Sequence, residues 1–310
     1  MPFPFFLEKD KNKMKTCTDC VRKCGVDRPE TLNGEGTFGF CRCPRNPVVA
    51  RAMLHCWEEP CISGTNGSGA VFFAGCNLRC VFCQNYEISS HVQGKEISVE
   101  RLREIYGELI RKGAHNINLV TPGHYTEAVL ASLSPALPVP VVYNTNGYDS
   151  LETLRKLAGK IQIYLPDLKY SDNALALKYS HAPDYFETAA AAIDEMFRQT
   201  GPYEMGDDGL LRRGVVVRHL ILPRQVENSL RVIDHIAHHF RPGDILFSLM
   251  RQYVPHGKIE EFPELNRRVT DEEYEQVEQY LFDSPIEDGF VQDEESASEE
   301  FIPDFDNSGV

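Results

Sequence analysis

The sequence lacks any long hydrophobic run and any surplus of basic residues. No stretch approaches the roughly 20 apolar residues of a membrane span, and the short apolar run at residues 2–7 has no basic residues before it, unlike a signal peptide. The formal net charge is −14, whereas a protein that binds duplex nucleic acid needs a basic surface. We therefore expect a cytoplasmic protein that binds neither a membrane nor nucleic acid.

Cysteine is absent after Cys83, although the chain contains 10 cysteines. In a reducing compartment, such enrichment indicates metal binding or catalysis rather than disulfides. The cysteines of structural disulfides are usually distributed along the whole chain, whereas metal-binding cysteines often cluster in one region. All ten cysteines lie between Cys17 and Cys83, so we expect the chemistry of the protein to depend on this region.

Composition divides the chain into three zones. Residues 1–60 are rich in cysteine and turn residues, and we interpret them as a cysteine-rich N-terminal segment. Residues 61–291 alternate strand-like and helix-like patterns and form the main domain, with a helix near its end. Residues 292–310 are acidic and mostly polar, which predicts a disordered tail.

The main domain has the pattern of an α/β fold. Most of its strand-like segments are short apolar runs, as expected of parallel strands buried on both faces, and amphipathic helical patterns lie between them. Six βα units are fewer than the eight of a closed TIM barrel, so the sequence predicts an open barrel or a doubly wound sheet, with ligands at the carboxyl ends of the strands. The predicted strands are residues 70–74, 117–121, 139–144, 161–166, 214–222 and 245–249.

Two helix starts match the capping-box pattern, in which a polar N-cap residue is followed three positions later by Glu. Asp149 with Glu152 predicts one helix start, and Thr270 with Glu273 predicts the start of the last helix.

The most specific motif is Cys76, Cys80 and Cys83, which follows the first predicted strand with C-x3-C-x2-C spacing. Three thiolates on one loop can hold a single compact cluster. A cubane cluster has four irons, so three cysteines leave one iron open, and an open coordination position distinguishes a reactive metal centre from a structural one. The alternatives are a zinc site or three buried thiols.

With Phe82 at the aromatic position, this motif resembles the C-x3-C-x-aromatic-C signature of the radical S-adenosylmethionine (SAM) superfamily. The resemblance implies a partial (β/α)6 TIM-like barrel and a [4Fe–4S] cluster on Cys76, Cys80 and Cys83. It further implies that SAM binds the open iron and is cleaved to a 5′-deoxyadenosyl radical, which abstracts hydrogen. In such enzymes the cofactor does the chemistry, and the protein supplies binding and orientation.

Residues 17–292 look more specifically like uncharacterised homologues of the pyruvate formate-lyase activating enzyme. The similar segments are residues 75–85, 144–148, 165–169 and 217–223. This resemblance implies an activating enzyme that places a glycyl radical on a partner protein, with an electron donor such as flavodoxin or ferredoxin. Thr121 stands where many radical SAM enzymes carry Gly-Gly-Glu, and Asn144 replaces an acidic residue, so we predict no cation site there.

Further candidate site residues lie at the ends of the predicted strands. Asp167 and Lys169 are two residues apart on an extended segment, so they point to the same face, and the resemblance implies contact with SAM. Arg218 could hold a carboxylate bidentately or pair with an acidic residue across the barrel, and both readings stay open. The candidate cofactor-binding residues are Gly75, Phe82, Gln84, Asn85, Thr121, Asn144, Asn146, Asp167, Lys169 and Arg218.

A second metal site is predicted in the N-terminal segment. Cys17, Cys20, Cys24 and Cys41 form a four-ligand set that suits zinc or a second iron–sulfur cluster, and spacing does not decide between them. Cys43 competes with Cys41 for the fourth position, and a set of free thiols is the alternative. A segment with so little apolar material would depend on a metal to fold.

Fold alone does not fix function, so other functions stay open. A radical SAM enzyme of this kind can act on a small molecule or a peptide instead of a partner protein. In a different class, the chain is a non-catalytic iron–sulfur or zinc protein, or a redox-sensing thiol protein without iron.

Overall fold

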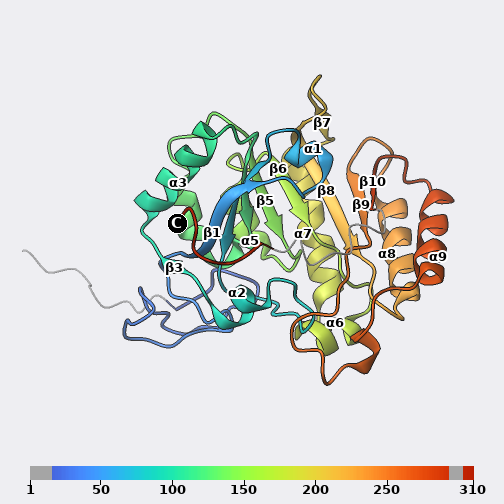
Figure 1. Ribbon diagram of the computed structural model, residues 1–310, viewed down its shortest axis with the longest axis horizontal. Coiled ribbons are helices and arrows are strands. Elements are labelled where there is room, and N and C mark those ends of the chain that lie inside the picture. The colour runs from blue at the N-terminus through green and yellow to red at the C-terminus, as the bar shows by residue number, and fades with distance from the viewer. Residues whose placement is uncertain (1–15, 293–302) are drawn as a thin grey trace, which may run out of the picture.

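The computed structural model describes residues 16–292 and 303–310. In this part of the chain, strands form a mostly parallel sheet that curves into a partial barrel with helices around it (Figure 1). The sheet order is β10-β9-β8-β6-β5-β4-β2-β1-β3, and β7 pairs with β8. The strands are β1 Val48–His55, β2 Ser68–Phe73, β3 Lys95–Glu96, β4 Ile117–Val120, β5 Val141–Thr145, β6 Ile163–Pro166, β7 Glu204–Met205, β8 Leu211–Leu220, β9 Leu246–Met250 and β10 Gly289–Val291.

Six consecutive parallel strands form the barrel wall, and they correspond to the six predicted strands. β2, β4, β5, β6, β8 and β9 pair side by side in chain order, each parallel to its neighbour. Every residue of β2, β4, β5, β6 and β9 is buried, as expected for parallel strands covered on both faces. The predicted α/β fold and partial barrel are confirmed.

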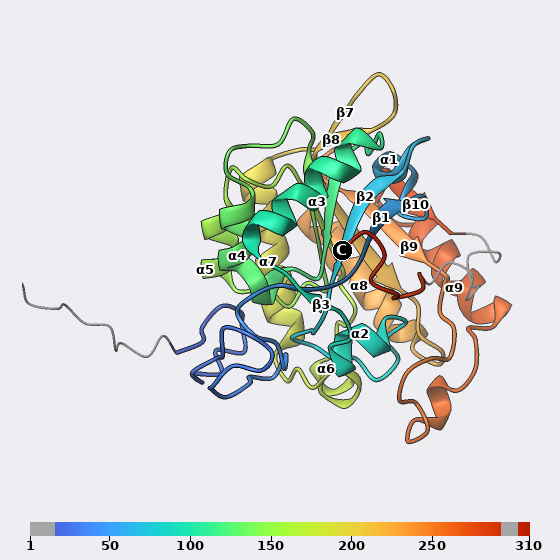
Figure 2. The ribbon, with the colours of Figure 1, turned by 60° about the vertical axis from the view of Figure 1, so that its left-hand side comes forward.

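The helices pack their apolar faces on the outside of the barrel (Figures 1 and 2). In α3, for example, Leu102, Ile105, Tyr106 and Leu109 are buried on one face. No helix in the described ranges is long and apolar enough to span a membrane. The helices are α1 Pro60–Ser63, α2 Tyr86–His91, α3 Val99–Arg111, α4 Thr126–Ser132, α5 Leu151–Leu157, α6 Asn173–Ser180, α7 Tyr185–Thr200, α8 Val226–His239 and α9 Asp271–Phe282, with 3-10 turns at Gly123–Tyr125 and Pro263–Leu265.

The two predicted capping boxes have different outcomes. Thr270 and Glu273 form the capping box at α9. The prediction at Asp149 is wrong, because Ser150 is the N-cap of α5 and its side chain makes no capping bond. The Asp149 carboxylate instead accepts hydrogen bonds from Tyr143 and Thr145 on β5, and burial raises the pKa of Asp149 to about 6.

β1 extends the barrel sheet beyond β2, the first of the parallel strands. It lies within the predicted N-terminal segment, yet it pairs antiparallel with β2 from Val49 to His55. The sheet of the main domain therefore begins at Val48, before the predicted boundary at residue 61. Because β1 is antiparallel to β2, the chain after β1 enters the amino-terminal end of the barrel.

The last eight residues pack against β1, so the prediction of a disordered tail does not hold for residues 303–310. Asn307 donates to the Ala50 carbonyl, and Ala52 donates to the Ser308 carbonyl. The Phe305 ring lies 5.6 Å from the Phe72 ring. β1 leaves this edge open beyond its short pairing with β3, and an unpaired edge favours added backbone hydrogen bonds. The rest of the predicted tail, residues 293–302, lies outside the described residues.

Candidate functional site

A cavity of about 220 Å³ lies at the carboxyl end of the barrel strands and extends into the barrel. Its lining comes from β2, β4, β5, β8 and β9, and from the segments that follow β1, β2 and β6. All thirteen residues predicted for the cluster and the cofactor line this one cavity: Gly75, Cys76, Cys80, Phe82, Cys83, Gln84, Asn85, Thr121, Asn144, Asn146, Asp167, Lys169 and Arg218. The structure brings them together, and their individual roles stay predictions.

The cysteine loop begins at a glycine that no other residue could replace without a shift. Gly75 has a φ of 81°, and a Cβ at this position would lie 2.1 Å from the Cys43 Sγ. The N-terminal segment is therefore packed directly against the start of the loop. Further along, the buried Phe82 ring packs against the rings of Tyr179 and Tyr253, which fixes the loop between Cys80 and Cys83.

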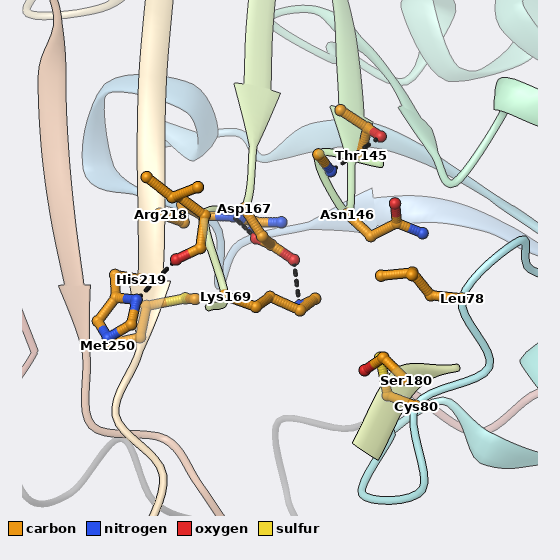
Figure 3. Close-up of polar contacts among 12 residues, drawn as sticks. Leu78, Cys80, Thr145, Asn146, Asp167, Lys169, Ser180, Arg218, His219 and Met250 are labelled. Atoms are coloured by element: carbon orange, nitrogen blue, oxygen red, sulfur yellow. Dashed lines mark hydrogen bonds and ion pairs between the residues drawn. The ribbon is translucent and has the colours of Figure 1, made fainter. Parts of the chain in front are cut away.

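The sulfur atoms of two loop cysteines accept hydrogen bonds. Asn146 Nδ2 and the Leu78 amide each lie 3.3 Å from the Cys76 Sγ. The Ser180 hydroxyl at the end of α6 lies 3.0 Å from the Cys80 Sγ. Figure 3 shows Cys80 and Ser180 next to each other, apart from the charged side chains of Asp167, Lys169 and Arg218. Donors aimed at sulfur stabilise thiolates and tune the potential of a cluster bound to them.

The chemistry of this donor set fits a [4Fe–4S] cluster. The described lining of the cavity contains three cysteines and no fourth, which leaves one iron open. No three His, Cys, Asp or Glu side chains of the described residues are arranged around a single metal ion. A cluster requires a different arrangement, because each cysteine binds its own iron. Burial raises the pKa of Cys80 to about 12, so metal binding here would release protons.

A buried ionic network crosses the cavity wall opposite the cysteines. Asp167 pairs with Arg218 in the sheet through an isolated parallel bridge. Its carboxylate lies 2.5 Å from Lys169 Nζ and 3.0 Å from Arg218 Nε (Figure 3). Burial opposes ionisation of Asp167, but the charges of Lys169 and Arg218 hold its pKa below the ordinary value. Asp167 and Lys169 thus share one face, as predicted.

Arg218 is the centre of this network. Besides Asp167, it contacts the Glu58 carboxylate at 3.0 Å and the Asn144 side-chain oxygen at 2.7 Å. Asn144 in turn donates to Glu58 at 3.1 Å. Of the two readings that the sequence left open, the ion pair across the barrel is the one that the structure contains.

The residues at the inner end of the cavity were not predicted from the sequence. His55, Glu58 and Glu59 follow β1 and line it. His55 Nδ1 and Glu59 Oε2 are buried without a hydrogen-bond partner in the described part of the chain. Burial, with Arg218 and Arg51, lowers the pKa of His55 to about 4, and burial raises the pKa of Glu59. Two adjacent glutamates directly after an apolar run were the signal available in the sequence.

The remaining predicted residues reach the cavity from strand ends and from the start of α2. Thr121 ends β4 in a left-handed conformation, with a φ of 58°, and its amide donates to the Asn144 carbonyl. Gln84 donates to the Gln252 carbonyl at 2.9 Å. Asn85 is the N-cap of α2, but its side chain makes no capping bond, so it is available to a ligand.

The N-terminal cysteines are gathered by turns. Burial raises the pKa of Cys20 to about 12, and the thiols of Cys41, Cys24 and Cys17 are near enough to raise it further. Cys43 donates its thiol proton to the carbonyls of Cys41 and Ala74. The hydrogen bond from Cys43 lowers the pKa of Cys41 to about 6, and Arg28 contributes. Among the two candidates for the fourth ligand, Cys41 is therefore the better thiolate.

Solved structures with a similar fold include the Streptococcus suis protein SuiB bound to S-adenosylmethionine, methylornithine synthase (PylB) and HydG, a maturase of the [FeFe]-hydrogenase. The sequence identities are 12%, 15% and 16%, the TM-scores are 0.48, 0.46 and 0.47, and the matches cover 70%, 67% and 70% of this chain. The chain spans 48%, 59% and 49% of the lengths of those three proteins.

An uncharacterised protein of Methanocaldococcus jannaschii is 29% identical over 285 residues, which cover 89% of this chain and 76% of that protein. The family model of the radical SAM superfamily matches residues 70–230, which include the cysteine loop and five of the six parallel barrel strands. The match covers more than half of the chain. The chain therefore belongs to the radical SAM superfamily, whose enzymes use a [4Fe–4S] cluster and S-adenosylmethionine.

Proposed function

We propose that this chain is an enzyme that cleaves SAM reductively and uses the 5′-deoxyadenosyl radical to abstract hydrogen from a substrate. Cys76, Cys80 and Cys83 would hold the cluster, which supplies one electron and an open iron for SAM. The observation that carries this proposal is the cavity itself, because the three cysteines and all ten other predicted residues line this one space.

The side chains around the cavity would bind and orient SAM. Asp167, Lys169 and Arg218 form a fixed ionic network, so their charges need little rearrangement when a polar ligand arrives. Gln84, Asn85 and Thr121 supply hydrogen-bonding groups near the cysteines, and Phe82 supports the loop from behind.

The N-terminal cysteines would hold a second metal, as zinc or an iron–sulfur cluster, through Cys17, Cys20, Cys24 and Cys41. The thiols of Cys41, Cys24 and Cys17 lie near enough to Cys20 to raise its pKa, which supports this assignment. Among the described residues no three of these side chains are arranged around a single ion, so a metal would draw the thiolates together as it binds. The low pKa of Cys41 favours its thiolate form, which is the form that binds metal. The role of this second metal would be to fold the segment that packs against Gly75.

The target of the radical has two candidates. Resemblance to the activating enzymes favours a glycine of a partner protein, with flavodoxin or ferredoxin as electron donor. The inner end of the cavity favours a small polar molecule, because His55 Nδ1 and Glu59 Oε2 are buried there without partners. A buried polar group without a partner is costly, so a ligand that satisfies these atoms would gain binding energy.

The first experiment reconstitutes the protein anaerobically with iron and sulfide, adds dithionite and SAM, and quantifies 5′-deoxyadenosine together with iron and zinc. We expect one [4Fe–4S] cluster that cleaves SAM and a second metal equivalent of zinc or iron. Failure to load iron would overturn the proposal. Iron without SAM cleavage, even after addition of cell extract, would favour the non-catalytic iron–sulfur protein.

The same reaction mixture can distinguish the two candidate targets when fractions of cell extract are added. Cell extract is divided by ultrafiltration into small molecules and proteins, and each fraction is added to the reduced enzyme with SAM. A glycyl-radical partner would give a carbon-centred radical signal in electron paramagnetic resonance with the protein fraction. A small substrate would raise the yield of 5′-deoxyadenosine with the small-molecule fraction.

A further inference from the structure

A second hollow, of about 360 Å³, lies on the outer side of the cysteine loop. Its basic side chains come from four separate parts of the chain, and Glu261 is its one acidic residue within the described ranges. The hollow and the inner cavity share no lining residue. The hollow, here called the basic hollow, is lined by Arg42, Arg79, Val81, Tyr86, Ser90, His91, His181, Lys258, Glu261 and Phe262.

The cations of the basic hollow are not neutralised by neighbouring carboxylates. Within the described residues, no carboxylate oxygen lies within 4.0 Å of a charged nitrogen of Arg42, Arg79 or Lys258. Arg42 and Arg79 donate instead to the backbone carbonyls of Ser90 and Phe40. Arg79 Nε is buried without a partner. Arg42 and Lys258 are exposed, and cations without a carboxylate partner favour an anionic partner.

The basic hollow lies directly behind the cysteines. Arg79 and Val81 line the hollow, whereas Cys80 and Phe82, which alternate with them, line the inner cavity. One short loop thus forms the inner wall of the reaction cavity and the floor of the outer hollow. A protein seated in the hollow would lie within one residue of a cluster ligand without entering the SAM cavity.

The same surface also includes the N-terminal cysteine segment. Arg42 lies between Cys41 and Cys43 in the sequence. The guanidinium groups of Arg22 and Arg79 lie over the Phe40 ring, at 4.1 and 5.0 Å from its centre. Both ribbon views place the N-terminal segment, α2 and α6 at the same end of the barrel (Figure 2). The basic hollow therefore adjoins both cysteine groups.

The loop that carries Lys258 is held against the cysteine loop. The Lys258 amide donates to the Val81 carbonyl at 2.7 Å. Gly257 has a φ of 82°, and a Cβ there would lie 2.4 Å from the Val81 oxygen, so only glycine allows this approach. The position of the Lys258 backbone is thus fixed by the loop that binds the cluster.

We propose that the basic hollow is the docking surface for an acidic protein that carries single electrons. This inference rests on the proposed function, because SAM cleavage requires one electron from outside the chain. Electron transfer between proteins weakens steeply with distance, so the carrier must dock near the cysteines. Complementary charge directs such encounters, and interfaces of redox partners are small, below about 1,200 Å².

The test measures binding of reduced flavodoxin, an acidic one-electron carrier, to the reconstituted protein by isothermal titration calorimetry at low and high salt. The variant is Arg42→Glu with Lys258→Glu. The matched control is Arg111→Glu with Lys112→Glu, which makes the same charge change at the end of α3, where the chain leads into the amino-terminal end of β4. SAM cleavage with dithionite, iron content and circular dichroism are measured for all three proteins.

We expect the Kd for flavodoxin to rise at least about tenfold in the hollow variant, to change less than about twofold in the control, and to rise with salt for the unmodified protein. Cleavage with dithionite should be the same in all three. Equal Kd values for the variant and the control would overturn the docking surface. Loss of only inorganic phosphate or oligonucleotide binding in the variant would overturn it in favour of another anion. Absence of cleavage with dithionite in the unmodified protein would overturn the proposed function, and the Kd values would still decide the docking surface.

Discussion

The two cysteine groups of this chain use the same side chain on very different supports. Cys76, Cys80 and Cys83 lie on a loop anchored to a fully buried strand, and they receive hydrogen bonds from Asn146 and Ser180. The N-terminal cysteines lie on turns that contain one isolated bridge, and the described residues 16–47 form no regular strand. The first group has a scaffold that is complete without metal, and the second group has almost none.

This difference illustrates how a reactive metal site differs from a structural metal site. A reactive site needs a missing ligand, an adjoining cavity and a scaffold that holds its geometry without help from the metal. The barrel supplies all three. A structural site needs only enough ligands to close around the metal, because the metal then provides the folding free energy. We therefore expect opposite responses when a cysteine is removed from each group.

The largest expected effect is at the barrel. Cys80→Ala should reduce SAM cleavage to background and remove the labile cluster, while the circular dichroism spectrum stays unchanged, because the strands around the loop pack independently of it. The assay is 5′-deoxyadenosine formation with dithionite. Cys61→Ala is the control, since Cys61 is buried but belongs to neither group. Normal cleavage by Cys80→Ala would refute the site assignment.

At the N-terminal segment the response should be structural. Cys20→Ala should remove the second metal equivalent and destabilise residues 16–47 by several kcal/mol, because metal binding and folding are coupled there. Limited proteolysis and metal analysis measure the two effects. The barrel cluster should remain. An unchanged metal count, or loss of the barrel cluster alone, would contradict the comparison.

The buried carboxyl group of Asp149 should make the stability of the barrel depend on pH. Asp149 fixes the end of β5 through Tyr143 and Thr145, and burial raises its pKa from 3.8 to about 6. A raised carboxyl pKa contributes stability that is present in acid and lost as pH rises through about 6. Between pH 5 and pH 7.5, the free energy of unfolding should therefore fall by about 1–2 kcal/mol more than in Asp149→Asn.

Urea unfolding at the two pH values tests this, with both proteins reconstituted in the same way. A difference between the proteins that is independent of pH would assign Asp149 a hydrogen-bonding role only. A difference of the opposite sign would contradict the raised pKa.

The smallest expected effect concerns the hydrogen bond to Cys80. Ser180→Ala removes the donor at 3.0 Å from the sulfur, so the thiolate-bound cluster should become harder to reduce. A change of about 1 kcal/mol corresponds to roughly 40 mV for one electron, and we expect a potential lowered by tens of millivolts. Redox titration followed by electron paramagnetic resonance measures it. Ser180→Thr, which keeps the hydroxyl, should restore most of the potential.

The sequence was sufficient for the parts of the molecule that follow local rules. The six barrel strands were recognisable because most of them are short apolar runs, and the cluster loop because its spacing is specific. Asp167 and Lys169 could be placed together because residues two apart on an extended segment point to the same face. The cap at Asp149 failed because the carboxylate bonds to β5 instead, a tertiary contact that the pattern does not contain.

The rest depended on contacts between distant residues. Glu58 and Arg218 are 160 positions apart, and Cys80 and Ser180 are 100 positions apart, so no local pattern could pair them. The tail showed the same limit. Its acidic composition predicted disorder. In the structure, however, the Phe305 ring contacts the Phe72 ring, and the backbone of residues 307–308 forms hydrogen bonds with the open edge of β1.

Arg42 and Arg79 both adopt left-handed backbone conformations, with φ values of 60° and 55°. This conformation costs a residue with a Cβ on the order of 1 kcal/mol, a cost that glycine avoids. Replacement of either arginine by glycine would therefore relax the backbone at the expense of the charge. A search for thermostable variants of this enzyme is expected to select glycine at these two positions. Under the docking surface proposed above, each such gain in melting temperature would be accompanied by weaker binding of the electron carrier.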